Sequence, residues 1–488
     1  MTTPRLSKSR YLAGLQCPKR LYLEVHAREL AGEIDEGMQA VLDAGTRVGT
    51  LARERYPNGA LVEVEHFKVE EGVARTATLL ADPAVDVLYE GFIVFDDVVV
   101  RPDILVRTPG NLWRLIEVKS TSRVKAEHLD DLAIQTYVLT GAGLTLDAAC
   151  LMHVNTGYLY PGGPLDLDQL FQEQELTAEV ATRQGEIPAR LAAMRRTLSA
   201  PTLPVIEPDD HCSAPYECPY WEHCTKDKPA RWIYHLPGNR RVFQDLVGLG
   251  IQTIDDIPAG YPLQFLQQRV KDNVEWIGPG LRAALAAVEY PVHHLDFETV
   301  GSAIPLYPHS RPYQAIPFQW SNHIETADGQ IHHEAYLCPD DRDPREELAV
   351  ALLKSVGQAG SICTYTEYER GVLTGLAEAL PRLRRDLLRV CDRLWDLHPV
   401  IKANYYHPGF DGSFSIKSVL PAVVPALAYD DLEIQEGAMA SVQFSRMVFE
   451  NVDEAERARV RAALLEYCAR DTLAMVELRR ALWTKAQA

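Results

Sequence analysis

The sequence predicts a multi-domain α/β protein. A chain of 488 residues is long enough for two or three domains. Its hydrophobic content of 47% and charged content of 24% are ordinary for a globular protein. In both halves, runs of β-branched residues alternate with stretches of helical periodicity, and the chain contains no fixed-period repeat or low-complexity tract.

The acidic charge balance of the chain argues against a protein that coats nucleic acid. The net charge is −19, from 49 Lys and Arg against 68 Asp and Glu. Proteins that coat nucleic acid are usually basic, whereas an enzyme that holds cations with carboxylates fits an acidic chain. The N-terminal stretch has no apolar signal core, and no run of about 20 apolar residues exists. We therefore expect a cytoplasmic protein with reduced thiols and no membrane partner.

The first domain is predicted to span residues 1–230 and to mix strands with helices. Periodicity predicts helices over 23–30, 40–56, 125–143 and 170–200, with β-rich segments over 85–107 and 112–120. Asp96 and Asp97 interrupt the first β-rich segment, and the turn signal 108–111 separates the two segments.

Two boundaries, near 230 and near 286, divide the rest of the chain. Residues 231–285 are predicted to form a small connector, with a helical hairpin over 236–260. The hairpin resembles a helix–hairpin–helix with Arg240 and Arg241 nearby; we favour a packing spacer over a DNA contact. Residues 286–488 are predicted to form a second α/β domain that begins with the alternating strand VHHLDFETV.

Three of the nine cysteines, Cys212, Cys218 and Cys224, form a series in which five residues separate each from the next. We expect Cys17 to be the fourth ligand, because Cys17 and Cys218 share a following proline. Four thiolates hold either zinc or a [4Fe–4S] cluster, and the wide spacing favours the cluster. Zinc and purely structural thiols stay open as alternatives. The other cysteines are interpreted as small buried hydrophobes: Cys150, Cys338, Cys363, Cys391 and Cys468.

A first acid cluster is predicted on two neighbouring strands. Glu117 and Lys119 point to the same face of their strand, and a hairpin lays Asp103 across from them. Two close carboxylates repel each other unless a cation lies between them, and oxygen ligands select Mg²⁺ or Mn²⁺. The lysine then orients water or neutralises charge on phosphorus oxygens. The alternative is a solvent-facing hairpin with ordinary surface charge.

Residues 5–228 resemble the RecB-like branch of the PD-(D/E)XK nuclease superfamily, specifically its iron–sulfur members. The resemblance rests on Pro102-Asp103, Glu117-x-Lys119, the helix with Gln135 and the four cysteines. It implies that Asp103 and Glu117 bind metal, that Lys119 is catalytic and that Gln135 supports the site. Relatives often carry one more ligand on an early helix, where Glu54 is the candidate here.

A second acid cluster is predicted in the C-terminal domain. Asp296 and Glu298 lie on one face of an apolar strand, and buried paired acids need a compensating charge. Tyr467 and Asp471 lie four residues apart and share a face of an amphipathic helix. A pair on the helix surface is the alternative interpretation of Tyr467 and Asp471.

Residues 290–480 resemble DnaQ-like (DEDD) 3′–5′ exonucleases of the RNase H-like fold. The resemblance implies four carboxylates around two metal ions, with Tyr467 positioning the attacking water. Glu369 in SICTYTEYERGVL is the candidate for the middle acid, and Asp396 is the reserve. Ser413 and Lys417 are candidates for phosphate contact, although a helix start explains them equally well.

The order of these parts resembles one bacterial family of predicted nucleases of unknown function, which joins a RecB-like iron–sulfur domain to a DnaQ-like domain. The stretches LSKSRYLAGLQCPKRLYL, PFQWSNHI and YCARDTLAMVEL are typical of that family. The sequence thus predicts a Mg²⁺- or Mn²⁺-dependent nuclease with two candidate sites that acts as an exonuclease, on single strands or at ends, and we favour DNA over RNA as its substrate. The alternatives are a non-catalytic nucleic-acid-binding scaffold and a protein with one active site.

Overall fold

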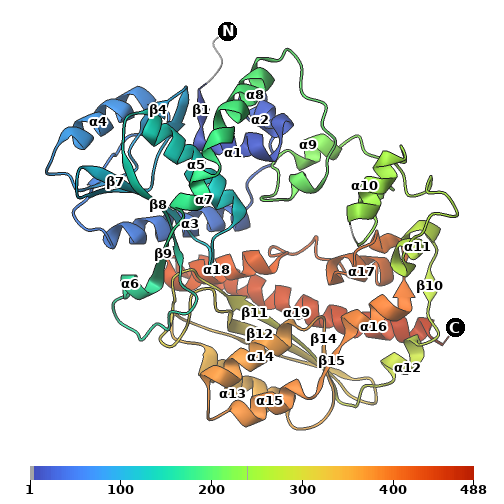
Figure 1. Cartoon of the computed structure of the whole chain (residues 1–488). Coiled ribbons are helices and arrows are strands. Elements are labelled where there is room, and N and C mark those ends of the chain that lie inside the picture. The colour runs from blue at the N-terminus through green and yellow to red at the C-terminus, as the bar shows by residue number, and fades with distance from the viewer. Residues whose placement is uncertain (1–4, 239, 488) are drawn as a thin grey trace. The chain divides into compact units, whose positions relative to one another are not determined.

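The structure is a computed structural model that describes residues 5–238 and 240–487. Its contacts divide the chain into two compact units. The first comprises the chain up to Asp227 with 302–306 and 310–313, and the second comprises 228–301, 307–309 and 314–488. Both units combine helices with mixed sheets, which confirms the predicted multi-domain α/β class (Figure 1). The residues predicted as a connector belong to the second unit.

The first unit is built on a six-stranded sheet with the order β2-β3-β6-β7-β8-β9. Its strands are β2 (Ala60–Leu61), β3 (Val87–Tyr89), β6 (Ile104–Thr108), β7 (Leu112–Lys119), β8 (Leu146–Val154) and β9 (Phe171–Glu175). β6 and β7 form an antiparallel hairpin, and β7 pairs with β8 in parallel. Gly110 and Asn111 have positive φ in the tight turn of this hairpin, a conformation that glycine and asparagine adopt readily.

Helices cover both faces of this sheet. Leu115 of β7 packs with α5 (Ala126–Gly141), whereas Ile116 and Val118 pack toward α3 (Glu36–Glu54). Because side chains alternate along a strand, Glu117 faces α5. Two more strands, β4 (Ile93–Phe95) and β5 (Val98–Val100), form a small sheet with β1 (Leu6–Ser7). The remaining helices are α1 (Lys8–Gln16), α2 (Pro18–His26), α4 (Val69–Ala81), α6 (Leu167–Leu170), α7 (Thr177–Ala181), α8 (Ile187–Ser199) and α9 (Trp221–Thr225).

The second unit is built on a five-stranded sheet with the order β13-β12-β11-β14-β15. Its strands are β11 (Val292–Val300), β12 (Ile316–Glu325), β13 (Ile331–Leu337), β14 (Ile362–Thr364) and β15 (Leu394–Asp396). β11, β12 and β13 are antiparallel, while β14 runs parallel to both β11 and β15. The predicted strand over VHHLDFETV is therefore confirmed, and it lies at the centre of the sheet.

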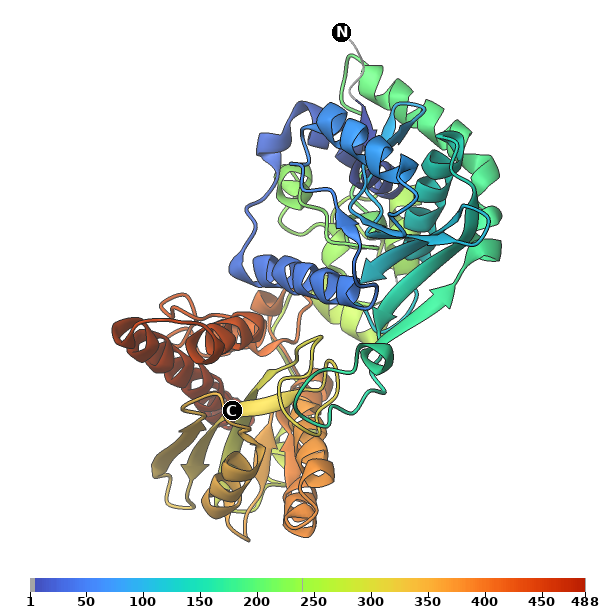
Figure 2. The same ribbon diagram turned by 90° about the vertical axis from the view of Figure 1, so that its left-hand side faces the viewer.

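The two faces of β11 meet different helices. Leu295 and Phe297 belong to a core shared with α13 (Arg345–Val356), α14 (Tyr368–Ala379) and α15 (Arg384–Cys391). The opposite face meets α18 (Gly437–Phe449) and α19 (Glu454–Lys485). Figure 2 shows the red C-terminal helices and the orange helices on opposite sides of these strands. Alternation therefore directs Asp296 and Glu298 toward α18 and α19.

Smaller elements complete the second unit. They are α10 (Arg240–Gly248), α11 (Phe265–Asp272), β10 (Trp276–Ile277), α12 (Leu281–Leu285), α16 (Leu397–Asn404), β16 (Tyr405–Tyr406) and α17 (Ile416–Val423). β10 pairs with β16. Among the helices of the described residues, none combines the length and the apolar character needed to cross a membrane.

Two predictions about local structure are wrong. Residues 171–175 form β9 rather than helix, because an edge strand pairs through its backbone with β8 while most of its polar side chains face solvent. The stretch 236–260 is not a helical hairpin: α10 is followed by a loop, and the next helix, α11, begins at Phe265. Buried Ile254 and Ile257 hold this loop, and the Arg240 guanidinium stacks 3.6 Å from the ring centre of Tyr234, consistent with a packing role.

Candidate metal sites

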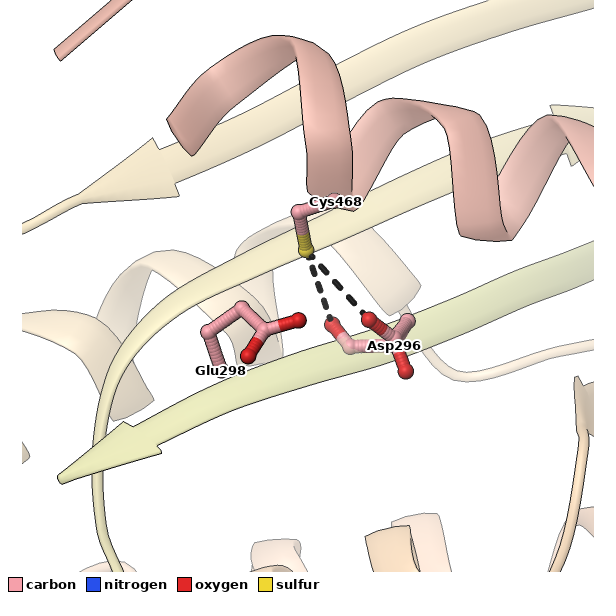
Figure 3. Close-up of side chains that lie close together, drawn as sticks. All are labelled: Asp296, Glu298 and Cys468. Atoms are coloured by element: carbon pink, nitrogen blue, oxygen red, sulfur yellow. Dashed lines mark hydrogen bonds between the residues drawn. The ribbon is translucent and has the colours of Figure 1, made fainter. Parts of the chain in front are cut away.

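The second acid cluster brings β11 and α19 together. The ligand atoms of Asp296, Glu298 and Cys468 all lie within 4.8 Å of one another. Figure 3 shows both carboxylates directed from β11 toward the helix that carries Cys468. The Cys468 thiol donates a hydrogen bond to Asp296 Oδ2 at 3.5 Å, and the sulfur lies 3.9 Å from the Asp296 carbonyl oxygen. Cys468 is thus buried, as predicted, but it packs against the acids rather than against apolar side chains alone.

Asp471 lies three residues after Cys468 on α19, and two phenols hold it. The Tyr429 hydroxyl donates a hydrogen bond to Asp471 Oδ1. Tyr467 also forms a side-chain hydrogen bond with Asp471. Tyr467 is buried, so the alternative of a helix-surface pair is wrong. Tyr429 was not predicted, because it lies in a loop 42 residues before Asp471 with no periodic signal.

Glu369 comes from the first turn of α14, directly after β14. A hydrogen bond of 2.6 Å between Thr299 and the Tyr368 hydroxyl ties the end of β11 to this turn. Glu369 is 3% exposed, and its Oε2 has no hydrogen-bond partner among the described residues. The charge of Glu369 raises the pKa of Asp296, although Glu369 lies outside the group of ligand atoms that are all within 4.8 Å of one another.

The reserve candidate, Asp396, has backbone partners. Its Oδ1 accepts hydrogen bonds from the amides of Thr366 at 3.0 Å and His398 at 2.9 Å, and it caps the start of α16. Its charge still acts on Glu369. Ser413 contacts the Ser415 hydroxyl at 3.2 Å, next to the start of α17, and the Lys417 ammonium donates to the Gln435 carbonyl.

The second cluster is strongly electronegative. Burial raises the pKa of Glu298 to about 8, and the Asp471 charge adds to this effect. Burial likewise raises the pKa of Glu369 to about 8 and that of Asp471 to about 6, and it holds the pKa of Asp296 well above its usual range. In the described part of the chain, none of the four forms an ion pair with Lys or Arg. Two carboxylates 4 Å apart repel by about 4 kcal/mol near a protein surface, so the cluster favours a bound cation.

The first acid cluster is arranged around Glu117, which is 1% exposed. Its Oε1 accepts from the ammonium groups of Lys8 at 2.6 Å and Lys119 at 2.7 Å. Its Oε2 accepts from Gln135 Nε2 at 2.7 Å. Asp103 approaches from the neighbouring strand, and its Oδ2 accepts from the Val118 amide at 2.7 Å. The structure therefore places all four predicted residues together.

Lys8 and Asp131 complete this network, and neither was predicted. Asp131 of α5 is 2.6 Å from the Lys119 ammonium, 3.3 Å from that of Lys8, and 2.8 Å from Gln135 Nε2. The position of Asp131, four residues before Gln135 on one helix face, was a usable signal. Lys8 was not predictable in this way, because 109 residues separate it from Glu117. Glu54, the loose candidate, is exposed at the end of α3.

The two lysines of this cluster lower the pKa of its central glutamate, whereas the acids of the second cluster have raised pKa values. Burial opposes ionisation of Glu117, but the ammonium groups of Lys119 and Lys8 hold its pKa below the usual range. Burial and then the Glu117 charge raise the pKa of Asp103 to about 7. A buried carboxylate paired with two lysines is stable without a metal ion.

The four predicted cysteine ligands line one small pocket in the first unit. Cys17 ends α1, and the Cys218 amide donates to the Cys212 carbonyl at 2.7 Å, which closes the loop between those residues. Burial raises the pKa of Cys212 to about 11, and the other three cysteines add to this rise. Lys19 and Arg20 also line the pocket. Cys150, Cys338, Cys363 and Cys391 are buried elsewhere, as predicted.

A family profile described as a domain of unknown function (DUF2779) matches residues 293–415. That stretch includes Asp296, Glu298 and Glu369 but ends before Asp471. No curated protein matches the chain. A solved crystal structure, that of SSO0001, is similar at 11% identity with a TM-score of 0.18, over 42% of this chain and 89% of that chain.

Proposed function

We propose that this chain is a divalent-metal-dependent nuclease that hydrolyses phosphodiester bonds of DNA, with its principal active site at the second acid cluster. The observation that carries the proposal is the close approach of Asp296 and Glu298, whose pKa values the charges of Glu369 and Asp471 raise further, without a lysine or arginine ion pair to any of the four in the described residues. Burial raises the pKa of Glu298 and Asp471 more than the Lys417 charge lowers it, and carboxylates left at this net negative charge are costly unless a cation is bound.

The residues fit Mg²⁺ or Mn²⁺, because carboxylate oxygens are the ligands that these ions prefer. A divalent ion bound there would lower the pKa of an attacking water and stabilise the leaving oxygen. Asp296, Glu298, Glu369 and Asp471 would hold it. Tyr429 and Tyr467 orient Asp471, and Tyr467 is suitably placed beside it to position the attacking water.

The fold supports this assignment. Asp296 and Glu298 lie beyond the short stretch of β11 that pairs with β14, toward the carboxyl end of these parallel strands. Glu369 follows β14 at the same edge. Ligands of open α/β sheets commonly bind at this edge. The mixed sheet with an acidic central strand and a long C-terminal helix supports the RNase H-like, DnaQ-like prediction for 286–488.

The first cluster is proposed as a second site of the PD-(D/E)XK type. Asp103, Glu117, Lys119 and Gln135 lie together as that prediction requires. Lys8 and Lys119 neutralise Glu117 and Asp131, however, and this specific observation favours the alternative in which the first unit binds DNA and the second cleaves it.

The four cysteines fit a [4Fe–4S] cluster better than zinc. Zinc-bound sulfurs in a tetrahedral site are separated by about 3.8 Å, given Zn–S distances of about 2.3 Å. Within the described residues, Cys17, Cys212, Cys218 and Cys224 contain no set of three sulfurs that all lie within 4.8 Å of one another. A cluster would tie the start of the first unit to its end.

Cleavage of end-labelled DNA tests the function. Single- and double-stranded DNA, with RNA in parallel, are incubated with Mg²⁺, Mn²⁺, Zn²⁺ or Co²⁺ and the wild-type protein, and with Glu298→Gln and Glu117→Gln. Glu334→Gln, at an exposed acid of β13, is the matched control. We expect DNA cleavage that Glu298→Gln abolishes and Glu334→Gln leaves intact. Absence of cleavage, or cleavage that survives both Glu298→Gln and Glu117→Gln, would overturn the proposal.

The binding alternative has its own readout. If the first unit binds DNA without cleaving it, Glu117→Gln leaves the cleavage step intact but changes DNA affinity. Affinity measured between about 50 and 200 mM salt separates phosphate contacts from other effects, because counterion release makes such contacts strongly salt-dependent. An inactive wild-type protein that still binds DNA would favour a scaffold.

A further inference from the structure

We propose that Cys468 is a metal ligand of the second acid cluster, and that this mixed carboxylate–thiolate site takes a thiophilic divalent ion such as Zn²⁺ or Co²⁺ in preference to Mg²⁺. The inference rests on the proposed function for the presence of a metal at this site and specifies which metal it selects. The geometry of three donor atoms carries it.

The sulfur is positioned at a ligand-to-ligand distance. Zn–S and Zn–O bonds of about 2.3 and 2.1 Å at a tetrahedral angle place sulfur and oxygen about 3.6 Å apart. Cys468 Sγ lies 3.5 Å from Asp296 Oδ2, and Glu298 completes a triplet within 4.8 Å. Figure 3 shows the three side chains converging from the strand and the helix above it. Without a metal, the same separation suits the thiol–carboxylate hydrogen bond.

The carboxylate of Glu298 and one carboxylate oxygen of Glu369 have no hydrogen-bond partner among the described residues. Glu298 is 7% exposed, and its carboxylate forms no hydrogen bond or ion pair within residues 5–238 and 240–487. Glu369 Oε2 is buried and has no hydrogen-bond partner in that same part of the chain. Buried polar atoms are normally satisfied, so the unsatisfied oxygen of Glu369, whose charge acts on Asp296, points to a ligand that bonds to it.

Helix α19 directs the Cys468 sulfur and the Asp471 carboxylate to the same side. Cys468 and Asp471 lie three residues apart on α19 and so share the face that covers β11. The Thr472 hydroxyl is already occupied by Ser321 at 2.8 Å and His323 at 2.7 Å. Tyr467, Cys468 and Asp471 are therefore the side chains of this helix turn that remain directed at the acids, and Cys468 is the one among them with a sulfur donor.

Donor chemistry sets the preference. Thiolate is a soft ligand that suits zinc and cobalt and suits Mg²⁺ poorly, whereas carboxylate accepts either class. Coordination converts the thiol to a thiolate, and its proton passes to solvent as the metal–sulfur bond forms. A site of carboxylates alone would show no such selectivity.

Cobalt spectroscopy tests the sulfur bond directly. Anaerobically purified full-length protein is titrated with Co²⁺, and its spectrum is compared with those of Cys468→Ser and Cys363→Ser. Cys363, on β14 of the same unit, is a buried cysteine outside the cluster and serves as the matched control. We expect a thiolate-to-cobalt charge-transfer band in the near ultraviolet that Cys468→Ser removes and Cys363→Ser retains. The difference spectrum cancels any contribution from the four-cysteine pocket.

Affinity provides the second measurement. Cys468→Ser is expected to weaken Zn²⁺ binding at this site at least about 10-fold while leaving Mg²⁺ binding within about 2-fold. Circular dichroism of the metal-free variants checks the fold. Should Cys468→Ser misfold, Glu298→Gln keeps the thiol and must retain the band while weakening Co²⁺ binding.

The outcomes separate this inference from the proposed function. DNA cleavage with identical cobalt spectra for the wild type and Cys468→Ser overturns the thiolate ligand and leaves the nuclease intact. A cysteine-dependent cobalt band without cleavage of DNA or RNA supports the metal site and overturns the nuclease. Equal weakening of Mg²⁺ and Zn²⁺ binding by Cys468→Ser overturns the selectivity.

Discussion

The two acid clusters use similar side chains and reach opposite electrostatic states. Each has a buried glutamate on a central strand and an aspartate on a neighbouring helix. In the first cluster, Lys8 and Lys119 pair with Glu117 and Asp131. In the second, burial and mutual repulsion raise the pKa values of the acids. Acidic residues on one face therefore do not by themselves indicate a metal site. Whether lysines form ion pairs with the carboxylates determines whether the cluster needs a bound cation.

Because of this difference, the largest expected effect of any substitution is on the rate of DNA cleavage when an acid of the second cluster is replaced. Asp296→Asn removes a charge that holds the proposed cation, so DNA cleavage should fall about 10⁴-fold, equivalent to about 5.5 kcal/mol in the barrier. Cleavage by Asp103→Asn should fall far less. Rates from labelled DNA under single-turnover conditions measure both, and equal losses would remove the proposed difference in catalytic role.

The next effect concerns stability at the first cluster. Glu117→Gln leaves Lys8 and Lys119 close together with one carboxylate between them instead of two. Breaking a buried ion pair from one side costs about 3–5 kcal/mol, so this unit should unfold at markedly lower denaturant concentration. Denaturation followed by circular dichroism measures the shift. Little change in the midpoint would mean that the lysines are not essential partners of Glu117.

At the second cluster, replacing the buried glutamate by glutamine should stabilise the metal-free protein, whereas the corresponding replacement at the first cluster should destabilise it. The pKa of Glu298 in the folded protein, about 8, is above its ordinary value of 4.5. The folded state then binds more protons than the unfolded state, so metal-free stability falls as pH rises from about 4.5 to 8. Glu298→Gln should stabilise the metal-free protein at pH 8 by about 1–2 kcal/mol and flatten this dependence. Thermal unfolding with a chelator from pH 5 to 8 checks the slope, and destabilisation by Glu298→Gln would contradict it.

The smallest expected effect concerns the phenol on Asp471. Tyr429→Phe removes one hydrogen bond to a carboxylate and should weaken metal affinity only by about 3- to 10-fold, equivalent to about 1 kcal/mol. Calorimetric titration with Mn²⁺ measures it, and Tyr336→Phe, at a phenol of β13 outside the cluster, is the control. A loss as large as that of Asp296→Asn would show that Tyr429 does more than orient Asp471.

Local periodicity accounts for what the sequence revealed about both sites. Alternation correctly placed Glu117 with Lys119 and Asp296 with Glu298, and helical spacing correctly paired Tyr467 with Asp471. These patterns depend on neighbours within four residues. The central position of β11 and the β6–β7 hairpin followed from their apolar character and from the turn between them.

What the sequence left hidden depends on contacts between distant segments. Lys8 reaches Glu117 across 109 residues, and Tyr429 reaches Asp471 across 42. Cys468 follows the helical apolar pattern, so only the structure shows that it meets Asp296. The edge strand β9 has no apolar alternation because its backbone, rather than its side chains, joins the sheet.

The four-cysteine pocket has a consequence for how the protein is made. Cys17 emerges from the ribosome about 200 residues before Cys224, an interval of about 10–40 s at typical rates of synthesis. Until residues 187–199 have been synthesised, α2 also lacks α8, the helix against which it packs. The segment around Cys17 therefore stays without its packing helix and its fellow ligands during synthesis, and the Cys17 thiol is exposed during that time. Premature release or oxidation during this interval should lower the yield of folded protein more than the same insult after synthesis is complete.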